Sequence, residues 1–113
     1  WMIHDNPPGK DYYNWTARCL SAGSPYNPYK IEWDPNHPED CSYNEVNLCR
    51  LGDLSRHGTL DIAGRKLDGP RISRKLFTDP LLPLSGVHSI LGKSLVIYDD
   101  HGPQARGERL ACT

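Results

Sequence analysis

Short runs of apolar residues, separated by glycine, proline, asparagine and aspartate, make up this chain, and the runs have the length of strands rather than helices. Residues 1–4 read as the end of a strand. Polar and apolar residues alternate over 59–62, as in a half-buried strand, and 71–77 reads as the returning strand. The most apolar run, 88–98, predicts a further strand, and 109–112 predicts a short last one. The pattern therefore predicts an all-β protein.

Two long connections separate these strands. Residues 5–49 are rich in proline, asparagine, aspartate, glycine and tyrosine with no sustained period, so they predict a loop. A loop of this length needs cross-links or has a function. It contains three of the four cysteines. Residues 79–86 are apolar, but their prolines exclude a helix. The region between Arg65 and Lys75 is basic, and it predicts a basic hairpin.

Composition narrows the class of protein. The 113 residues are enough for one domain, and ten glycines and ten prolines suit a loop-rich β protein. The formal net charge of −1 argues against nucleic acid as a partner. Within residues 1–113 no apolar run is long enough to span a bilayer, and no stretch reads as a signal peptide. Because the chain starts within a strand pattern, we expect it to be a piece of a longer secreted precursor.

Four cysteines also point to an oxidising compartment. An even number of cysteines in a short chain favours two disulfides. Cys41 and Cys49 do not form a C-x-x-C pair, so the spacing does not favour zinc. The sequon that begins at Asn14 predicts an N-linked glycan if the chain enters the secretory pathway.

Four segments occur in an order that resembles the copper superoxide dismutase family, particularly its extracellular copper-only branch. They are Trp1-Met2-Ile3-His4, then 19–28 (CLSAGSPYNP), then 52–58 (GDLSRHG), and last 84–98 leading to Arg109-Leu110-Ala111-Cys112. The resemblance implies a Greek-key β-barrel of which the first three to four strands look absent.

Residues 1–113 are then expected to be the carboxy-terminal part of one such domain. Residues 1–54 would hold a strand end and a long disulfide-stapled loop, and 55–113 would hold the remaining strands. A partial barrel has open edges and an uncovered core face, so a preceding segment or another chain is expected to complete it.

The resemblance also implies a disulfide map. Cys19 lies in the Cys-x-Ser-Ala-Gly loop of the family and Cys112 in its Leu-Ala-Cys ending, so these two are expected to pair. Cys41 and Cys49 match an extra short bridge of the copper-only branch.

The copper-binding positions that the resemblance implies are mostly substituted. The His-x-His pair of the family reads Met2-Ile3-His4 here, the bridging histidine falls on Tyr26, and the last histidine falls on Tyr98. One of four ligands remains. Protonated phenols are poor metal ligands at neutral pH, so we expect the tyrosines to form hydrogen bonds across the space of the metal.

The zinc positions are substituted as well. Arg50 and Trp33 fall where the family has histidines, and only Asp53 matches a zinc ligand. We expect Asp53 to tie loop backbone by hydrogen bonds. Arg109 matches the arginine that guides superoxide in active relatives, and its alternative role is a salt bridge to a carboxylate.

These substitutions predict a module that is not an enzyme, has no cofactor, and has a structural or protein-interaction role within a larger extracellular protein or assembly. A second hypothesis is a residual superoxide dismutase, or a protein that handles copper or zinc through Met2, His4, His37 or His101. A third is binding of glycans or matrix through the basic hairpin between Arg65 and Lys75.

Overall fold

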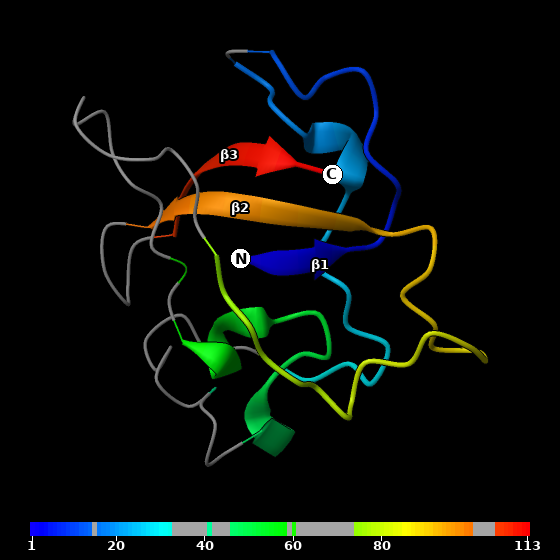
Figure 1. Cartoon of the computed structure of the whole chain (residues 1–113). Coiled ribbons are helices and arrows are strands. Elements are labelled where there is room, and N and C mark those ends of the chain that lie inside the picture. The colour runs from blue at the N-terminus through cyan, green and yellow to red at the C-terminus, as the bar shows by residue number, and fades with distance from the viewer. Residues whose placement is uncertain (15, 33–40, 42–45, 59, 61–73, 101–105) are drawn as a thin grey trace.

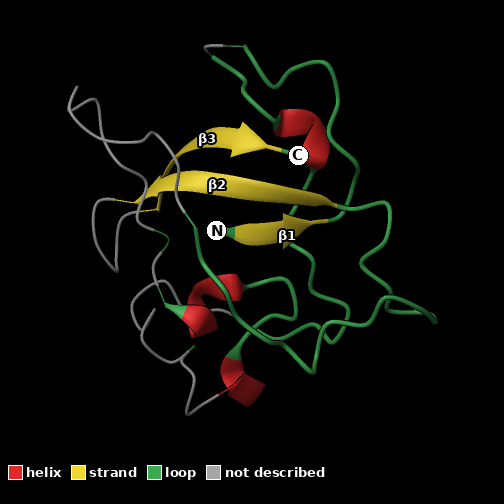
Figure 2. Cartoon of the chain, in the orientation of Figure 1, coloured by secondary structure: helices red, strands yellow, loops and turns green. Residues whose placement is uncertain are grey.

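The computed structural model of the chain contains strands and short 3-10 turns (Figure 1). The residues described are 1–14, 16–32, 41, 46–58, 60, 74–100 and 106–113. Their elements are β1 (Met2–His4), η1 (Leu20–Ala22), η3 (Val46–Leu48), η4 (Leu54–His57), β2 (Ser94–Asp100) and β3 (Arg106–Cys112), where η denotes a 3-10 turn. No α-helix occurs in this part of the chain, and the segments coloured as helix in Figure 2 are these 3-10 turns. The predicted all-β class is confirmed.

The three strands form one antiparallel sheet with β2 in the middle (Figure 1). Ile3 of β1 pairs with Leu95 of β2, and Val96 of β2 pairs with Cys112 of β3. The β2–β3 register is irregular on both sides of Tyr98. Segments from the two ends of the chain therefore lie side by side.

The predicted strand over 88–98 is only partly right. Residues 88–93 form turns, and the strand starts at Ser94. Gly92 has a φ of 78°, which interrupts an extended conformation. The last strand is longer than expected, because β3 already begins at Arg106.

The expected returning strand over 71–77 is not found where the structure describes it. Residues 74–77 have no strand structure, and Leu76 is 93% exposed. Residues 71–73 lie outside the described residues, as do most of 59–62 and the basic stretch 65–73. The described part of the 5–49 connection contains no strand, which agrees with a loop. Among the described residues no helix has the length and apolar character needed to cross a membrane.

Two loops cover the edge of β1 that faces away from β2. The Ile3 N–H donates to Gly52 O at 2.8 Å, the Tyr26 N–H donates to Ile3 O at 2.8 Å, and the Gly52 N–H donates to Tyr26 O at 2.9 Å. A Cβ on Gly52 would lie 2.6 Å from Ile3 O, so only glycine permits this close approach. The described part of β1 is thus paired on both edges.

All three residues of β1 are buried. Since neighbouring side chains of a strand point to opposite faces, β1 is covered on both faces. On one face Ile3 packs in an apolar cluster with Tyr26, Leu51 and Leu54. Met2 and His4 point to the other face, and both are completely buried. The sheet therefore positions a histidine in the interior.

Candidate functional site

His4 has hydrogen bonds at both ring nitrogens. Its Nδ1 lies 2.7 Å from Gly23 O, and its Nε2 lies 2.6 Å from the Tyr98 hydroxyl. A carbonyl oxygen only accepts, so Nδ1 carries the proton and Nε2 accepts from the phenol when the ring is neutral. The predicted hydrogen-bonding role of Tyr98 is found here.

Arg109 shares an acceptor with this histidine. Its Nη2 donates to Gly23 O at 2.9 Å and its Nη1 donates to Cys19 O at 2.7 Å. Gly23 has a φ of 77°, a conformation that favours glycine. The guanidinium of Arg109 thus binds loop carbonyls, where the sequence suggested an anion contact or an ion pair.

Tyr26 does not join the His4–Tyr98 pair. It is 7% exposed, its ring is part of the apolar cluster around Ile3, and Lys93 Nζ lies 4.3 Å from the ring centroid. Burial, followed by the nearby charges of Tyr29 and Asp5, raises the pKa of the Tyr26 phenol above its ordinary value. The phenolate, the form that binds metals well, is therefore disfavoured.

Met2, Arg50 and Asp53 form a second polar contact beside β1. Arg50 Nη2 lies 3.8 Å from the sulfur of Met2 and 3.8 Å from Asp53 Oδ2. Asp53 Oδ1 accepts from the Ser55 N–H at 3.0 Å and so caps η4. Asp53, which is 2% exposed, therefore ties loop backbone as expected.

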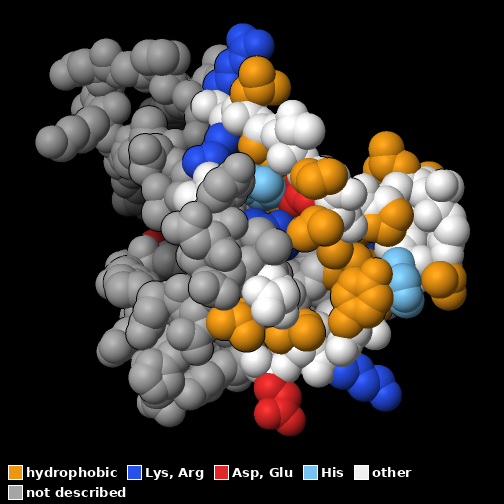
Figure 3. Space-filling model, turned by 90° about the horizontal axis from the view of Figure 1, so that it is seen from below, with side chains coloured by type: hydrophobic (Ala, Val, Ile, Leu, Met, Phe, Trp, Pro, Cys, Tyr) orange, Lys and Arg blue, Asp and Glu red, His pale blue; other side chains and the backbone are white. Residues whose placement is uncertain are grey.

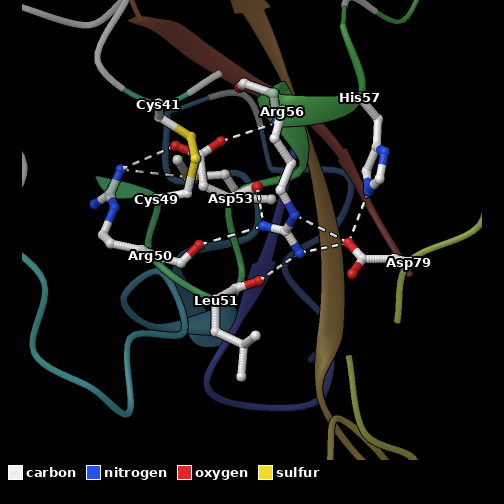
Figure 4. Close-up of a disulfide and its surroundings, with 10 residues drawn as sticks. Cys41, Cys49, Arg50, Leu51, Asp53, Arg56, His57 and Asp79 are labelled. Carbon is white, nitrogen blue, oxygen red and sulfur yellow. Dashed lines mark hydrogen bonds and ion pairs between the residues drawn. A yellow bond between two sulfur atoms is a disulfide. The ribbon is translucent and has the colours of Figure 1, made fainter. Parts of the chain in front are cut away.

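A buried ionic cluster at η4, not identified from the sequence, consists of Arg56, His57 and Asp79 (Figure 4). Asp79 Oδ2 accepts from Arg56 Nη2 at 2.5 Å and from His57 Nε2 at 2.7 Å. Arg56 also donates to the carbonyls of Leu51, at 3.1 Å, and Asp53. The cluster joins η4 to the loop that begins at Asp79.

The pKa of the Asp79 carboxyl reflects opposing effects. Burial by itself would raise this pKa, but hydrogen bonds from His57, the Leu81 N–H and Arg56, together with the charge of Arg56, hold it below its ordinary value. The carboxylate therefore stays ionised at neutral pH. The Asp-Pro start of an apolar loop was the sequence signal that could have pointed to an anchoring residue.

Both disulfides implied by the family resemblance are present. Cys19 is bonded to Cys112 across a separation of 93 residues, and Cys41 is bonded to Cys49 across a separation of 8. The first bridge attaches the loop that precedes η1 to the end of β3. The second lies beside the Arg56 cluster (Figure 4).

Comparison with known proteins identifies three superoxide dismutases as relatives. A superoxide dismutase (Cu-Zn) of Cryptococcus neoformans var. grubii is 33% identical over 109 residues, which cover 86% of this chain and 60% of that protein. Superoxide dismutase (Cu-Zn) 5 of Dictyostelium discoideum is 34% identical, with 81% of this chain and 50% of that protein covered. An extracellular superoxide dismutase (Cu-Zn) of Caenorhabditis elegans is 32% identical, with 79% of this chain and 33% of that protein covered.

The chain therefore spans about a third to three-fifths of the length of these relatives. No protein-family model matches it. The relatives confirm the predicted type of fold, a β-barrel of the superoxide dismutase class.

Two sequence-based predictions are wrong in the light of these relatives. The chain was predicted not to be an enzyme, but all three relatives are named superoxide dismutases, which are enzymes. It was also predicted to have no cofactor, but the names of the relatives specify copper and zinc. Substitutions at single ligand positions do not by themselves show that a member of an enzyme family lacks activity or cofactor.

The described residues do not fit a copper or zinc centre by themselves. Copper sites of this kind require several nitrogen donors, and both nitrogens of His4 are hydrogen-bonded within the protein. No group of three or more histidine, cysteine or acidic side chains that could hold a metal occurs among the described residues. Trp33, His37 and His101, named in the sequence-based hypotheses, lie outside them, as does most of the basic hairpin.

Proposed function

We propose a function for this chain, which, as these matches show, belongs to the copper-zinc superoxide dismutase family. In this proposal residues 1–113 form the carboxy-terminal part of one superoxide dismutase-type domain. Their role is that of a disulfide-stapled structural and protein-interaction unit in a secreted protein. A preceding segment or another chain covers the apolar surface that this unit exposes.

The observation that carries the interaction role is the apolar loop between η4 and β2. Hydrophobic side chains gather on the face seen from below in Figure 3. Among its described residues 74–93, the exposed large apolar side chains are Leu76 (93%), Phe77 (37%), Leu81 (47%), Leu84 (64%), Val87 (92%) and Leu91 (69%). Extended apolar surface of this kind marks sites of interaction with other proteins or other segments.

Hydrogen bonds within this loop and ion pairs to η4 fix its conformation. The Ile90 N–H donates to Pro83 O at 3.0 Å, and the Ser89 N–H donates to Gly86 O at 3.2 Å. Asp79, within this loop, is bound to Arg56 and His57 in the buried cluster. A surface held in one conformation loses less entropy when a partner binds, which favours association.

Two observations support secretion. Both disulfides need an oxidising environment to form and persist. One of the relatives is named as an extracellular enzyme. The test is the redox state of the cysteines in the protein isolated from its cells with thiols blocked at lysis. Four oxidised cysteines in protein recovered from the medium support secretion, and reduced cysteines in protein recovered from the cytosol contradict it.

The interaction role is tested by sedimentation velocity of the purified protein. We expect an assembly heavier than the 12.7 kDa of one chain. The double substitution Val87→Asp and Leu91→Asp should abolish it, whereas Tyr13→Asp, at an exposed aromatic residue of another loop, should not. Folded, purified wild-type protein that sediments with the mass of a single chain would refute the role.

Superoxide dismutation by the whole protein is a second candidate function, favoured by the relatives. In that case the required nitrogen ligands come from outside the described residues. Metal analysis of protein isolated without added metal, together with a superoxide assay before and after chelation, tests it. Activity that is lost on chelation and restored by copper establishes the activity. Metal-free protein that stays inactive after copper loading excludes it.

A further inference from the structure

An exposed loop precedes η1, and hydrogen bonds to Asp11 close this loop. The Asp11 carbonyl accepts from the Asn14 N–H at 3.2 Å and from the Cys19 N–H at 3.1 Å. The Asp11 carboxylate accepts from the Ser21 N–H at 2.7 Å and from the Ser21 hydroxyl at 2.6 Å. The hydrogen bonds from the Ser21 hydroxyl and N–H lower the pKa of the Asp11 carboxyl, so the carboxylate is maintained at neutral pH.

The loop projects beyond β3 at the top of Figure 1, away from the apolar loop after η4. The Cys19–Cys112 disulfide attaches its end to the sheet. Its tip is therefore accessible and is supported by a covalent bond and four hydrogen bonds to Asp11.

Asn14 is exposed at this tip and is the first residue of an Asn-x-Thr sequon. Its Oδ1 accepts from the Thr16 N–H at 3.1 Å and from the Thr16 hydroxyl at 3.2 Å. Its Nδ2 has no hydrogen-bond partner within the described part of the chain. The side-chain oxygen is thus held by Thr16, while the nitrogen that accepts a glycan remains accessible.

Two exposed aromatic side chains come directly before the sequon. Tyr12 is 58% exposed and Tyr13 is 67% exposed, and their rings meet edge to face with centroids 4.9 Å apart. They occupy the central positions of the turn closed by the bond between the Asn14 N–H and Asp11 O. The faces of aromatic rings are negative, so they attract the positively polarised C–H groups of a sugar ring.

We propose that Asn14 carries an N-linked oligosaccharide whose first N-acetylglucosamine packs on the Tyr12–Tyr13 pair. This inference rests on the secretion included in the proposed function. The donor is a lipid-pyrophosphate-linked oligosaccharide. Asn14 Nδ2 forms a bond to C1 of the first sugar, the bond from C1 to the pyrophosphate oxygen breaks, and the lipid pyrophosphate leaves. The amide proton passes to a base of the transferase.

Occupancy is tested on protein recovered from the medium of eukaryotic cells that secrete it. We expect the intact mass to fall on treatment with peptide N-glycosidase and Asn14 to be converted to Asp. Asn14→Gln and Thr16→Ala should each abolish the glycan, whereas Thr16→Ser, which keeps the hydroxyl, should retain it. An intact mass equal to that of the bare polypeptide would overturn the proposal.

Packing on the tyrosines is tested by unfolding the glycosylated and enzymatically deglycosylated forms in urea. We expect deglycosylation to raise the unfolding equilibrium constant of the wild type by about two- to tenfold, from the size of aromatic contacts. In Tyr12→Ala with Tyr13→Ala the glycan should have no such effect. Tyr29→Ala, at another exposed tyrosine, should behave as the wild type. An equal effect of the glycan in the double variant and the wild type would refute the packing.

Failure of this inference can be told apart from failure of secretion. Protein in the medium with four oxidised cysteines and no sugar refutes the glycan and leaves secretion intact. Reduced protein confined to the cytosol refutes secretion itself.

Discussion

The hydroxyl of Tyr98 lies 2.6 Å from Nε2 of His4, although 94 residues separate them in the sequence. The histidine is completely buried, and its other nitrogen is bonded to Gly23 O. Each potential hydrogen bond of the imidazole is therefore made within the protein. Loss of either partner would leave a buried polar atom unsatisfied.

Tyr98→Phe is accordingly expected to lower the free energy of unfolding by about 1–3 kcal/mol, because Nε2 of His4 loses its donor while remaining buried. Urea denaturation followed by tyrosine and tryptophan fluorescence measures this change. The matched control is Tyr29→Phe, since Tyr29 is 61% exposed and can keep its ring contact with His88. Equal stability of Tyr98→Phe and wild type would show that the hydrogen bond is not maintained in solution.

Arg109→Lys is expected to reduce the free energy of unfolding by about 1–3 kcal/mol. One ammonium group cannot reproduce the forked contact of the guanidinium with the carbonyls of Cys19 and Gly23. Arg74→Lys, at an exposed position, is the control and should change little. A similar effect of the two substitutions would indicate that Arg109 does not hold the loop.

Ionisation of Asp79 should make the free energy of unfolding depend on pH in the acid range. Its pKa is lower in the folded protein than in the unfolded chain, so its ionised form stabilises the fold above the unfolded pKa of about 3.8. This contribution is lost as the pH falls through the lower, folded value. Unfolding free energies measured from pH 7 down to acid should therefore decrease more steeply for the wild type than for Asp79→Asn. Glu108→Gln, at an exposed carboxyl, should follow the wild-type curve.

Arg56→Met should destabilise the fold by about 3–5 kcal/mol, because it leaves the buried Asp79 carboxylate without its main cationic partner. Combining it with Asp79→Leu should recover part of that loss, since the isolated charge is then removed. Thermal and urea unfolding of the two variants measure the difference. A double variant less stable than the sum of the single changes would contradict this explanation.

The two disulfides should contribute unequally to stability. Replacing Cys19 and Cys112 by alanine is expected to cost about 4–5 kcal/mol and replacing Cys41 and Cys49 about 2–3 kcal/mol, because the longer bridge restricts the unfolded chain more. Urea unfolding of the two double variants compares them. The reverse order would mean that the entropy of the unfolded chain does not determine the difference.

The sequence by itself determined the features that depend on local patterns. Short apolar runs between chain breakers predicted an all-β chain, and the terminal strands β1 and β3 fall where those runs lie. Motif order indicated the family, and the family resemblance in turn implied both disulfide pairs. The strand positions and the motifs follow from residue type and spacing, which a linear pattern contains.

Beyond the disulfides that the family resemblance implied, the tertiary structure decided which polar side chains meet. It paired His4 with Tyr98, left Tyr26 in the apolar cluster, and joined Arg56 to Asp79 across 23 residues. The strand expected over 88–98 is shorter because residues 88–93 form turns. Such outcomes depend on burial and on the geometry of loops that pack against the sheet, and neither is encoded in a local pattern of residues.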